Sequence, residues 1–307
     1  MTPFDALIAQ GRVRPHEPLG PMTTYKVGGP ARWFMEAESE QDVIDLAAVI
    51  GADPLPIVVL GRGSNLLVSD AGFDGLVVRL GRGMTGLELG DDGLVKAGAG
   101  LPQAALARGT GTRSRGGLEF MVGIPGWVGG AVRMNAGSWG SDTAEWLVRA
   151  RVIDLATGAV TDRDPASLGL RYRHSTLTDS EVVVSAVFRT VERPAAECEA
   201  QLREITRWRR ENQPGGTYIG GSVFKNPGER TAGQIIDELG LKGLSIGRAT
   251  VSERHANFIV AEPGASAHDI HSLMLEVRSR VAAATGIELE SELRLVGDFG
   301  EARRPPG

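Results

Sequence analysis

The chain has 307 residues, of which 42% are hydrophobic and 23% are charged, so it can bury a substantial core and is long enough for roughly two domains. Its net charge of -5 and isoelectric point near 5.7, without a block of like charges, exclude a strongly basic surface for nucleic acid or an anionic membrane. We therefore expect neither as a partner, and any phosphate-bearing ligand must be held by local groups.

Three absences from the sequence indicate the cellular setting. The single cysteine, Cys198, cannot form an internal disulfide, and no run approaches the roughly 18 apolar residues of a membrane-spanning helix. The apolar stretch 6–9 is too short for a secretory signal. We therefore expect a cytoplasmic protein, and we expect it to be a monomer. Because no histidine neighbours Cys198, we interpret it as an incidental thiol.

The first third of the chain is predicted to combine short strands with one amphipathic helix. Residues 31–36 form the first expected strand. Ser39 and Asp42 form a capping box at the start of a helix that Gly51 ends. Further strands are expected at 57–60, 77–80 and 94–97, between glycine turns. The apolar positions of the predicted helix are Val43, Leu46, Ala47 and Ile50.

The middle of the chain is predicted to contain a short helix, a hairpin and a longer strand. Pro102 suits the first position of a helix that extends to Arg108. Two strands at 151–155 and 159–161 flank Thr157-Gly158 and form the expected hairpin. A strand at 182–191 follows, and the polar, helix-like stretch 195–211 leads into a new domain.

The last third is predicted to alternate helices at 231–239 and 266–284 with strands at 257–261 and 287–296. We therefore divide the chain into a lead-in, an α+β domain of two lobes, a second α+β domain and a tail that we expect to be disordered. The corresponding residues are 1–20 for the lead-in, 21–194 for the first domain with lobes at about 21–95 and 96–194, 195–299 for the second domain, and 300–307 for the tail.

Two glycine-rich loops are the first candidates for a binding site. The loop 60–65 follows a strand, and its glycines would allow backbone N–H groups to converge on a phosphate. Leu66 stands where a dinucleotide fingerprint requires its third glycine, and no Walker sequence is present. By itself this loop is better interpreted as an ordinary tight turn.

The second loop, 123–137, carries more glycine than a simple connection needs. A backbone that must approach a ligand closely explains this composition. Asn135 and Ser138 would then supply hydrogen bonds to the polar edges of that ligand.

These loops, together with residues 23–30, resemble the FAD-binding half of the UDP-N-acetylenolpyruvoylglucosamine reductase family. The resemblance extends from about Leu19 to Gly297. It implies a two-lobed FAD-binding fold of the vanillyl-alcohol-oxidase (PCMH) type followed by a C-terminal α+β substrate-binding domain, with the FAD pyrophosphate on the loop 61–65. The residues that it implies for cofactor binding are Tyr25, Gly28, Gly61, Arg62, Gly63, Ser64, Asn65, Gly123, Ile124, Pro125, Gly126, Gly129, Gly130, Asn135, Ala136 and Gly137.

The stretch 172–175 resembles the family's Tyr-Arg-x-Ser motif. That resemblance implies that Arg173 faces the reacting enolpyruvyl group. A planar guanidinium suits this task, because hydride addition to an enol ether builds negative charge. Without the resemblance, Arg173 would be an ordinary surface arginine. We expect the adjacent His174 to be exposed to solvent.

The stretch 220–227 matches the family's Gly-Ser-x-Phe-Lys-Asn-Pro motif, which makes Ser222 the implied proton donor. Without the family, a serine after two glycines is usually a turn residue. If the segment is extended, Ser222, Phe224 and Asn226 share one face, so the serine and the asparagine would both address the substrate.

The family's Glu-x-Arg motif near the C-terminus implies that Glu292 is the catalytic glutamate. We expect Glu292 and Arg294 on the polar face of the strand 287–296, where the arginine would orient the glutamate or meet the substrate carboxylate. The expected substrate-binding residues are Tyr172, Lys225, Asn226 and Arg294. Because no tyrosine lies between Ser175 and Val191, the chain resembles the second, shorter type of the family. Asn226, Lys225 and Arg210 are alternative candidates for binding the UDP diphosphate.

The histidines at 16, 174, 255, 268 and 271 form no HExxH or Cys/His grouping, so we predict no catalytic metal. We expect a structural role for His255.

The resemblance implies a reaction in which NADPH reduces FAD, after which a UDP-linked enolpyruvyl sugar is reduced to UDP-N-acetylmuramate for peptidoglycan synthesis. Two alternatives are a flavin oxidase of the same fold and a sugar-nucleotide-binding protein that has lost its flavin. The Ser222 and Glu292 motifs argue against the oxidase.

Overall fold

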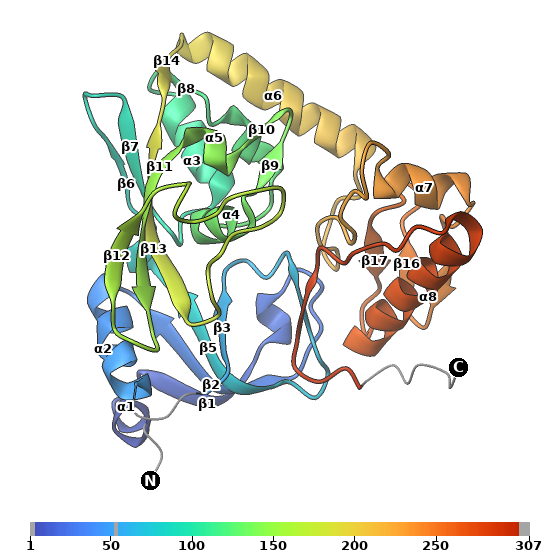
Figure 1. The fold of residues 1–307 in the computed structure, drawn as a ribbon, viewed down its shortest axis with the longest axis horizontal. Coiled ribbons are helices and arrows are strands. Elements are labelled where there is room, and N and C mark those ends of the chain that lie inside the picture. The colour runs from blue at the N-terminus through green and yellow to red at the C-terminus, as the bar shows by residue number, and fades with distance from the viewer. Residues whose placement is uncertain (1–3, 52–54, 301–307) are drawn as a thin grey trace. The chain divides into compact units, whose positions relative to one another are not determined.

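The computed structural model describes residues 4–51 and 55–300, and its contacts divide the chain into two compact units (Figure 1). Unit 1 takes its described residues from Met1–Pro15, Trp33–Arg62 and Gly75–Asn212. Unit 2 takes them from His16–Arg32, Gly63–Asp74 and Gln213–Gly307. Each unit is therefore assembled from segments that are distant in the sequence.

A four-stranded sheet contains the first predicted strands, with β3 and β5 parallel and in register from Ile57↔Leu76 to Leu60↔Arg79. The capping box of α2 is present, and its four predicted apolar residues are buried, so this helix is confirmed. The elements of this part are α1 (Asp5–Ala9), β1 (Val13–Pro18), η1 (Gly20–Met22), β2 (Pro30–Ala37), α2 (Glu40–Ile50), β3 (Ile57–Leu60), β4 (Leu66–Val68) and β5 (Phe73–Leu80), and the sheet order is β1-β2-β5-β3.

An antiparallel sheet in the order β12-β11-β13-β7-β6 forms the second layer of unit 1. The predicted hairpin is confirmed as β11 (Leu147–Asp154) and β12 (Val160–Arg163). The next predicted strand, 182–191, ends two residues too late, because β13 (Glu181–Arg189) ends where its partner strand β7 begins at Leu94. The remaining strands here are β6 (Leu87–Leu89), β7 (Leu94–Gly98), β8 (Arg115–Gly116), β9 (Gly137–Ser138), β10 (Ser141–Asp142) and β14 (Val191–Glu192).

The helices of unit 1 include one that the sequence pattern did not predict. Helix α4 (Val128–Met134) lies inside the glycine-rich stretch, where the low helix propensity of its glycines conceals it. The predicted helix after Pro102 is longer than expected, and the polar stretch after Pro194 is confirmed as one long helix. The others are η2 (Arg82–Met84), α3 (Gln103–Gly111), η3 (Glu119–Gly123), α5 (Thr143–Trp146) and α6 (Ala195–Asn212).

In unit 2, helix α8 packs on the small antiparallel sheet β15-β16-β17 (Figure 1). Both helices of this part carry capping boxes, with Thr231 and Ser266 as their N-cap residues. The elements are α7 (Ala232–Glu238), β15 (Ser245–Ile246), β16 (Ala249–Val251), β17 (Ile259–Ala261), α8 (Ala267–Thr285) and β18 (Arg294–Val296), and β18 pairs in parallel with β4.

The predicted strand at 287–296 was wrong over most of its length, because only β18 is a regular strand. Leu289 and Leu293 are buried as expected. Leu295, however, is 40% exposed and Val296 is buried, so the alternation of faces reverses at the end. The residues before β18 bond to the irregular segment around Phe224, which makes only an isolated bridge with Ser291 and cannot impose a strict alternation.

The compact units divide the chain differently from the predicted domains. Helix α6 belongs to unit 1, whereas the predicted second domain begins at residue 195. The assignment of each predicted domain to a ligand stays a prediction. Residues 301–307 of the predicted disordered tail lie outside the described residues.

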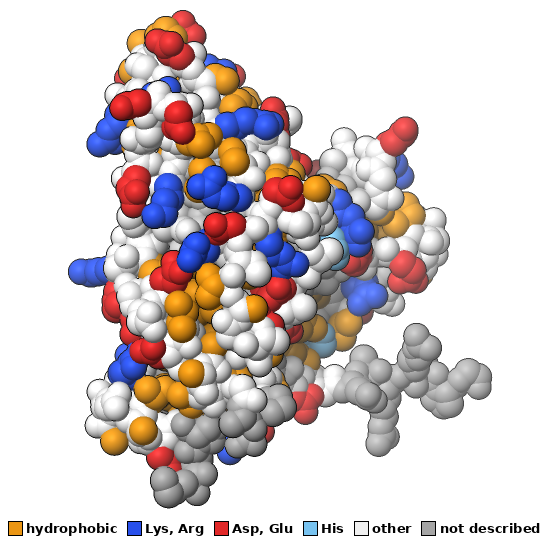
Figure 2. Space-filling model, turned by 60° about the vertical axis from the view of Figure 1, so that its left-hand side comes forward, with side chains coloured by type: hydrophobic (Ala, Val, Ile, Leu, Met, Phe, Trp, Pro, Cys, Tyr) orange, Lys and Arg blue, Asp and Glu red, His pale blue; other side chains and the backbone are white. Residues whose placement is uncertain are grey.

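Charged side chains of both signs are interspersed over the face shown in Figure 2, among scattered hydrophobic side chains. Among the described residues, no helix combines the length and the apolar character needed to cross a membrane.

A buried carboxylate ties the start of α6 to the rest of unit 1. Glu119 is 3% exposed, pairs with Arg193 at 3.0 Å and accepts the Gly117 N–H at 2.7 Å. Cys198 is buried nearby, and burial, followed by the adjacent Glu119, raises the pKa of its thiol to about 11. This is the setting of an unreactive structural thiol, as the sequence indicated.

Replacing Glu119 by alanine should lower the free energy of unfolding by about 2 to 4 kcal/mol, because it leaves Arg193 without this partner and the Gly117 N–H unsatisfied. Urea denaturation measures the loss. Glu199→Ala removes only the exposed pair with Arg203 and should change the midpoint little. Equal effects of the two substitutions would contradict a structural role for Glu119.

Candidate active site

Unit 2 brings the segments of Ser222 and Glu292 side by side. The Glu292 N–H donates to the Val223 carbonyl at 2.8 Å, and the Lys225 N–H donates to the Glu290 carbonyl at 2.9 Å. Ser222 and Glu292 are each half-buried. Two residues that are distant in the sequence, and that were predicted to be catalytic, are thus held on adjacent lengths of backbone.

Asn257 fixes the segment of Ser222 from the other side. Its carbonyl oxygen accepts the Phe224 N–H at 2.9 Å, and its amide donates to the Phe224 carbonyl at 2.8 Å. The Val223 N–H donates to the Asn257 backbone carbonyl at 3.0 Å. Because Asn257 is 4% exposed, these bonds are shielded from water and hold the backbone firmly.

The end of the predicted phosphate loop joins the same group of segments. The Gly221 N–H donates to the Ser64 carbonyl at 3.1 Å. The side chain of Asn65 donates to the Glu292 carbonyl at 3.0 Å, and its own carbonyl accepts the Arg294 N–H at 3.0 Å. The amide of Asn65 therefore positions Glu292, a role that the expectation of cofactor binding did not include.

Tyr25 is fully buried in unit 2 and lies against Gly220. A Cβ atom at Gly220 would lie 2.6 Å from Cε2 of the tyrosine ring, so only glycine fits there. Burial raises the pKa of Tyr25 well above its usual range. The ring therefore supports the segment before Ser222. The expected contact of Tyr25 with the cofactor stays a prediction.

The expected substrate-binding residues of unit 2 have partners within the protein. Lys225 forms an ion pair with Glu290 at 2.5 Å. The side-chain oxygen of Asn226 accepts the Ala232 N–H at 3.1 Å and so helps to cap α7. The predicted alternation around Ser222 is also interrupted, because Val223 and Phe224 are both buried. The interaction of Glu292 with Arg294 stays a hypothesis.

In unit 1, Arg173 occupies a tight turn beside the glycine-rich stretch. The His174 N–H donates to the Arg171 carbonyl at 3.0 Å and closes the turn. The guanidinium of Arg173 donates to the Gly137 carbonyl at 3.0 Å and lies 5.2 Å from the Tyr172 ring centroid. Tyr172 is 52% exposed. His174 is half-buried, whereas full exposure to solvent was expected.

Backbone strain is concentrated around Gly137. Asn135, Trp139 and Arg173 all have positive φ, at 40°, 56° and 51°. Such angles are unfavourable for side-chain-bearing residues and persist only where the surroundings impose them. Clusters of strained residues are typical of functional sites. This one lies at the end of the glycine-rich loop 123–137, which we call the cradle.

Asn135 and Ser138 form hydrogen bonds within the protein, and the ligand contacts expected of them stay predictions. The amide of Asn135 donates to Asp142 at 3.0 Å and accepts the Ala144 N–H at 2.8 Å, and the residue is 2% exposed. The Ser138 hydroxyl donates to the Phe120 carbonyl at 2.9 Å. Both side chains therefore hold the shape of the cradle from within.

The glycines of the cradle differ in why they are needed. A Cβ at Gly129 would lie 3.1 Å from Ala99, and one at Gly137 would lie 2.7 Å from Cβ of Asp142, so packing alone explains these two. A Cβ at Gly130 would meet nothing within 4 Å. Packing therefore does not explain this last glycine. Its open position is compatible with the expected approach of FAD to the backbone of α4, which stays a prediction.

The other residues expected to bind the cofactor lie along the same loops. Gly28 and Gly63 are required by packing, since added Cβ atoms would lie 2.6 Å from Val68 and 2.8 Å from Thr23. Ala136 is buried. The contacts of Gly61, Arg62, Ser64, Ile124, Pro125, Gly126 and Ala136 with a cofactor stay predictions.

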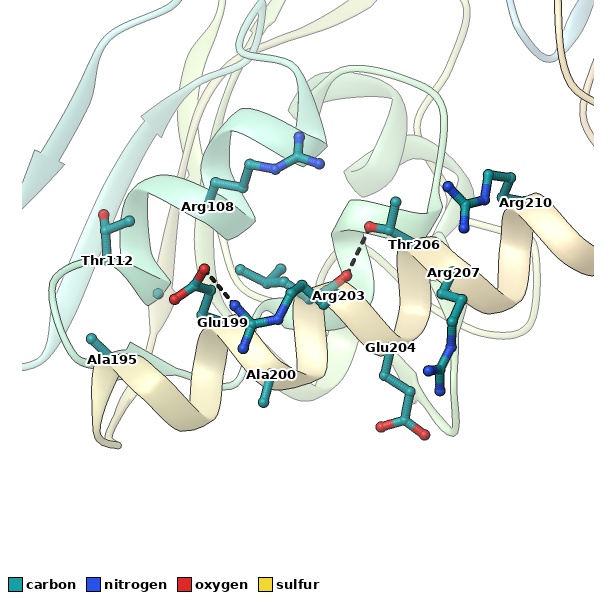
Figure 3. A pocket seen from close by; sticks show the side chains of 12 residues that line it. Arg108, Thr112, Ala195, Glu199, Ala200, Arg203, Glu204, Thr206, Arg207 and Arg210 are labelled. Atoms are coloured by element: carbon teal, nitrogen blue, oxygen red, sulfur yellow. Dashed lines mark hydrogen bonds and ion pairs between the residues drawn. The ribbon is translucent and has the colours of Figure 1, made fainter.

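A groove of about 1040 Å³ lies between α3 and α6, away from every predicted catalytic residue of unit 1 (Figure 3). Arg210, which the sequence left as a candidate for the UDP diphosphate, lines it. The groove carries charges of both signs, and Arg203 is paired with Glu199 at 2.6 Å. It therefore has the character of a solvated surface. Its lining residues are Arg108, Gly111, Thr112, Ala195, Glu199, Ala200, Leu202, Arg203, Glu204, Thr206, Arg207 and Arg210.

The structure thus brings together Asn65, Ser222 and Glu292 in unit 2, and Arg173 with Gly137 in unit 1. The approach of Arg173 to Ser222 and Glu292 stays a prediction. Sequence reasoning missed Asn257, although a polar residue at the start of an apolar run was a usable signal. His255 packs against Phe258, with ring centroids 4.9 Å apart, in line with the structural role expected of it.

Replacing Asn257 by alanine should cost about 2 to 3 kcal/mol of stability in unit 2, because both backbone groups of Phe224 lose buried partners. Asn257→Asp keeps the acceptor for the N–H but places a carboxylate against the Phe224 carbonyl, so it should not restore stability. Thermal unfolding of both variants checks this. Stability equal to wild type in Asn257→Ala would show that the segment of Ser222 is held by other contacts.

Comparison with known proteins agrees with this geometry. Residues 213–296 match the C-terminal domain of UDP-N-acetylenolpyruvoylglucosamine reductase, and residues 31–163 match an FAD binding domain. The UDP-N-acetylenolpyruvoylglucosamine reductases of Azorhizobium caulinodans and Caulobacter vibrioides are 39% and 41% identical to the chain, over 94% and 95% of it and 92% and 97% of their own lengths.

The crystal structure of the enzyme from Thermus caldophilus, 36% identical, superposes with a TM-score of 0.80 and covers 93% of this chain and 99% of its own. These matches confirm the predicted fold class, an FAD-binding fold of the vanillyl-alcohol-oxidase (PCMH) type with a C-terminal α+β domain. The chain therefore belongs to the UDP-N-acetylenolpyruvoylglucosamine reductase family and is an oxidoreductase with an FAD-binding domain.

Proposed function

We propose that this protein reduces UDP-N-acetylglucosamine enolpyruvate to UDP-N-acetylmuramate, with FAD as cofactor and NADPH as the source of hydride. We further propose that it does so in the cytoplasm, as a monomer, in the synthesis of peptidoglycan precursors. The observation that carries the proposal is the pairing of the Ser222 and Glu292 segments through the bond from the Glu292 N–H to the Val223 carbonyl. Family membership supplies the substrate.

Bound FAD would supply the hydride, received from NADPH, to the methylene carbon of the enolpyruvyl group. The task of the protein is then to hold the substrate and to manage charge and protons. Negative charge develops on the enolate and carboxylate of the substrate as the hydride arrives. Preorganised donors aimed at that charge contribute most when their positions are fixed before the reaction.

Arg173 is suited to meet the developing charge. Its guanidinium is oriented by the bond to the Gly137 carbonyl, and its backbone is held in a strained turn. Such a group needs little reorganisation when charge appears, and its planar fork matches a carboxylate or enolate. We propose that Glu292, whose backbone is anchored to Val223 and Asn65, acts from unit 2 as a neutral carboxylic acid that donates a hydrogen bond to the same developing negative charge.

Ser222 is proposed to deliver the proton that completes the reaction. Its backbone is fixed on one side by Ser64 and on the other by Asn257, so its hydroxyl is carried by a rigid support. A serine hydroxyl is a weak acid, but the carbanion-like centre left after hydride addition is strongly basic. Proton transfer from a positioned side chain contributes roughly 100- to 10,000-fold to such steps.

Removing the Ser222 hydroxyl should separate the two halves of the reaction. In Ser222→Ala, NADPH should still bleach the yellow flavin, whereas anaerobic recolouring by the enolpyruvyl sugar should slow by roughly 100-fold or more. Stopped-flow absorbance measures both phases. Ser245→Ala removes an exposed hydroxyl of unit 2 and should leave both phases unchanged.

The same experiment separates the proposed function from its alternatives. Recolouring by oxygen alone, with no response to the sugar, would indicate an oxidase. A colourless protein that binds the sugar nucleotide would indicate loss of the flavin. Normal recolouring in Ser222→Ala would remove Ser222 from the mechanism.

Arg173→Ala should remove about 3 to 4 kcal/mol of transition-state stabilisation and so lower the turnover rate, because a charged donor is lost. FAD should stay bound. Steady-state kinetics and the flavin spectrum measure the two effects. Arg171→Ala, in the same turn but with an exposed side chain, is the matched control. Unimpaired turnover in Arg173→Ala would refute the assignment.

A further inference from the structure

Two arginines of unit 1 contact the segment 123–127, at the start of the cradle. The guanidinium of Arg209, in the last turn of α6, donates a hydrogen bond to the Gly123 carbonyl. The guanidinium carbon of Arg79, on β5, lies 5.2 Å from the Trp127 ring centroid. These contacts come from parts of the chain that are far apart in the sequence.

A third arginine, Arg62, comes to the same place from the phosphate loop. The preceding Gly61 lies beside Trp127, since a Cβ at Gly61 would be 3.8 Å from Cε3 of that ring. Leu60 is paired with Arg79 across β3 and β5, so the start of the loop and Arg79 are neighbours. We call Arg62, Arg79 and Arg209 the arginine cluster.

The arginine cluster has no compensating carboxylate. Within residues 4–51 and 55–300, none of its three members forms an ion pair with an acidic side chain, and Nε of Arg79 is buried without a hydrogen-bond partner. Burial, together with the charge of Arg62, lowers the pKa of Arg209. Arg79 and Arg209 are half-buried and Arg62 is exposed. Partly buried charges of one sign are costly unless a bound anion offsets them.

The position of Arg209 is fixed by packing one turn earlier in α6. A Cβ at Gly123 would lie 3.0 Å from Cγ2 of Ile205, so the helix is in close contact with the cradle there. Residues four apart lie on the same face of a helix, which places Arg209 over the same segment. The guanidinium is therefore held in place before any ligand arrives.

The groove between α3 and α6 differs from the arginine cluster because its basic residues lie beside acidic ones. There Arg203 has Glu199 as an ion-pair partner, and acidic residues lie among the basic ones (Figure 3). The arginine cluster lacks such partners and lies against the glycine-rich backbone, so it is the better anion site.

We propose that Arg62, Arg79 and Arg209 together clamp a diphosphate group against the segment 123–127. Guanidinium groups bind phosphate oxygens bidentately, and three of them match an anion that carries more than one charge. The inference rests on the proposed function, in which two ligands carry a diphosphate: FAD and the UDP-linked sugar. The same chemistry fits either, and the experiment distinguishes them.

The test measures ligand affinity in the full-length protein, stripped of flavin, for Arg62→Gln, Arg209→Gln and wild type. FAD, FMN and riboflavin are titrated by flavin fluorescence, and UDP-N-acetylglucosamine is titrated by calorimetry into the FAD-loaded protein. Loss of one charged hydrogen-bond donor should lower the affinity for the clamped ligand by roughly ten- to a hundredfold. Riboflavin, which has no phosphate, should bind every variant as it binds wild type.

Arg207→Gln is the matched control, because it removes an exposed arginine of the same helix that lines the groove. It should leave all affinities unchanged. Arg209→Lys keeps the charge and should recover part of the loss. It also provides the comparison if thermal unfolding shows that Arg209→Gln is misfolded.

Weaker FAD binding with unchanged UDP-sugar binding assigns the clamp to the cofactor, and the reverse result assigns it to the substrate. Unchanged affinity for both ligands overturns the proposal. An equal loss for riboflavin and FAD also overturns it, because the arginines would then only shape the cradle. If wild type binds no flavin at all, the proposed function fails, and that result is distinct from failure of the clamp.

Discussion

The arrangement of the candidate site depends on the buried amide of Asn257. Its side chain satisfies both backbone groups of Phe224, and its own carbonyl satisfies Val223. With that segment fixed, Glu292 can bond to Val223 and Asn65 can bond to Glu292. Each further contact uses backbone that the previous one has already positioned, so the order of unit 2 around Ser222 depends on one buried amide that bonds to both backbone groups of Phe224.

Unit 1 achieves rigidity by different means, since its cradle combines strained backbone with internal hydrogen bonds. The side chains of Asn135 and Ser138 form hydrogen bonds within the protein, and packing explains Gly129 and Gly137. Gly130, in contrast, has an open position that packing does not explain. A cradle held from within keeps its shape without the ligand, so less ordering free energy is lost on binding.

The predictions that succeeded relied on signals that are local in the sequence. The capping box of α2 and the hairpin of β11 and β12 are specified by residues within a few positions of each other. The strand at 287–296 failed because its partner around Phe224 is irregular, which the alternation of residues cannot reveal. Asn257 and Arg209 bond to residues 33 and 86 positions away, so only the fold discloses their roles. Ser222, Glu292 and Arg173 were reachable because short motifs carry them.

Helix α6 runs without interruption from Cys198, beside the buried Glu119, to Arg209 at the cradle. At 1.5 Å per residue, the 11 residue steps from Cys198 to Arg209 carry the effect of anchoring at one position across about 17 Å to the other. A ligand held at the cradle end would therefore favour the same helical state that the buried carboxylate favours. Flavin present at a hundred times its dissociation constant would add about 2.7 kcal/mol to the stability of the folded protein.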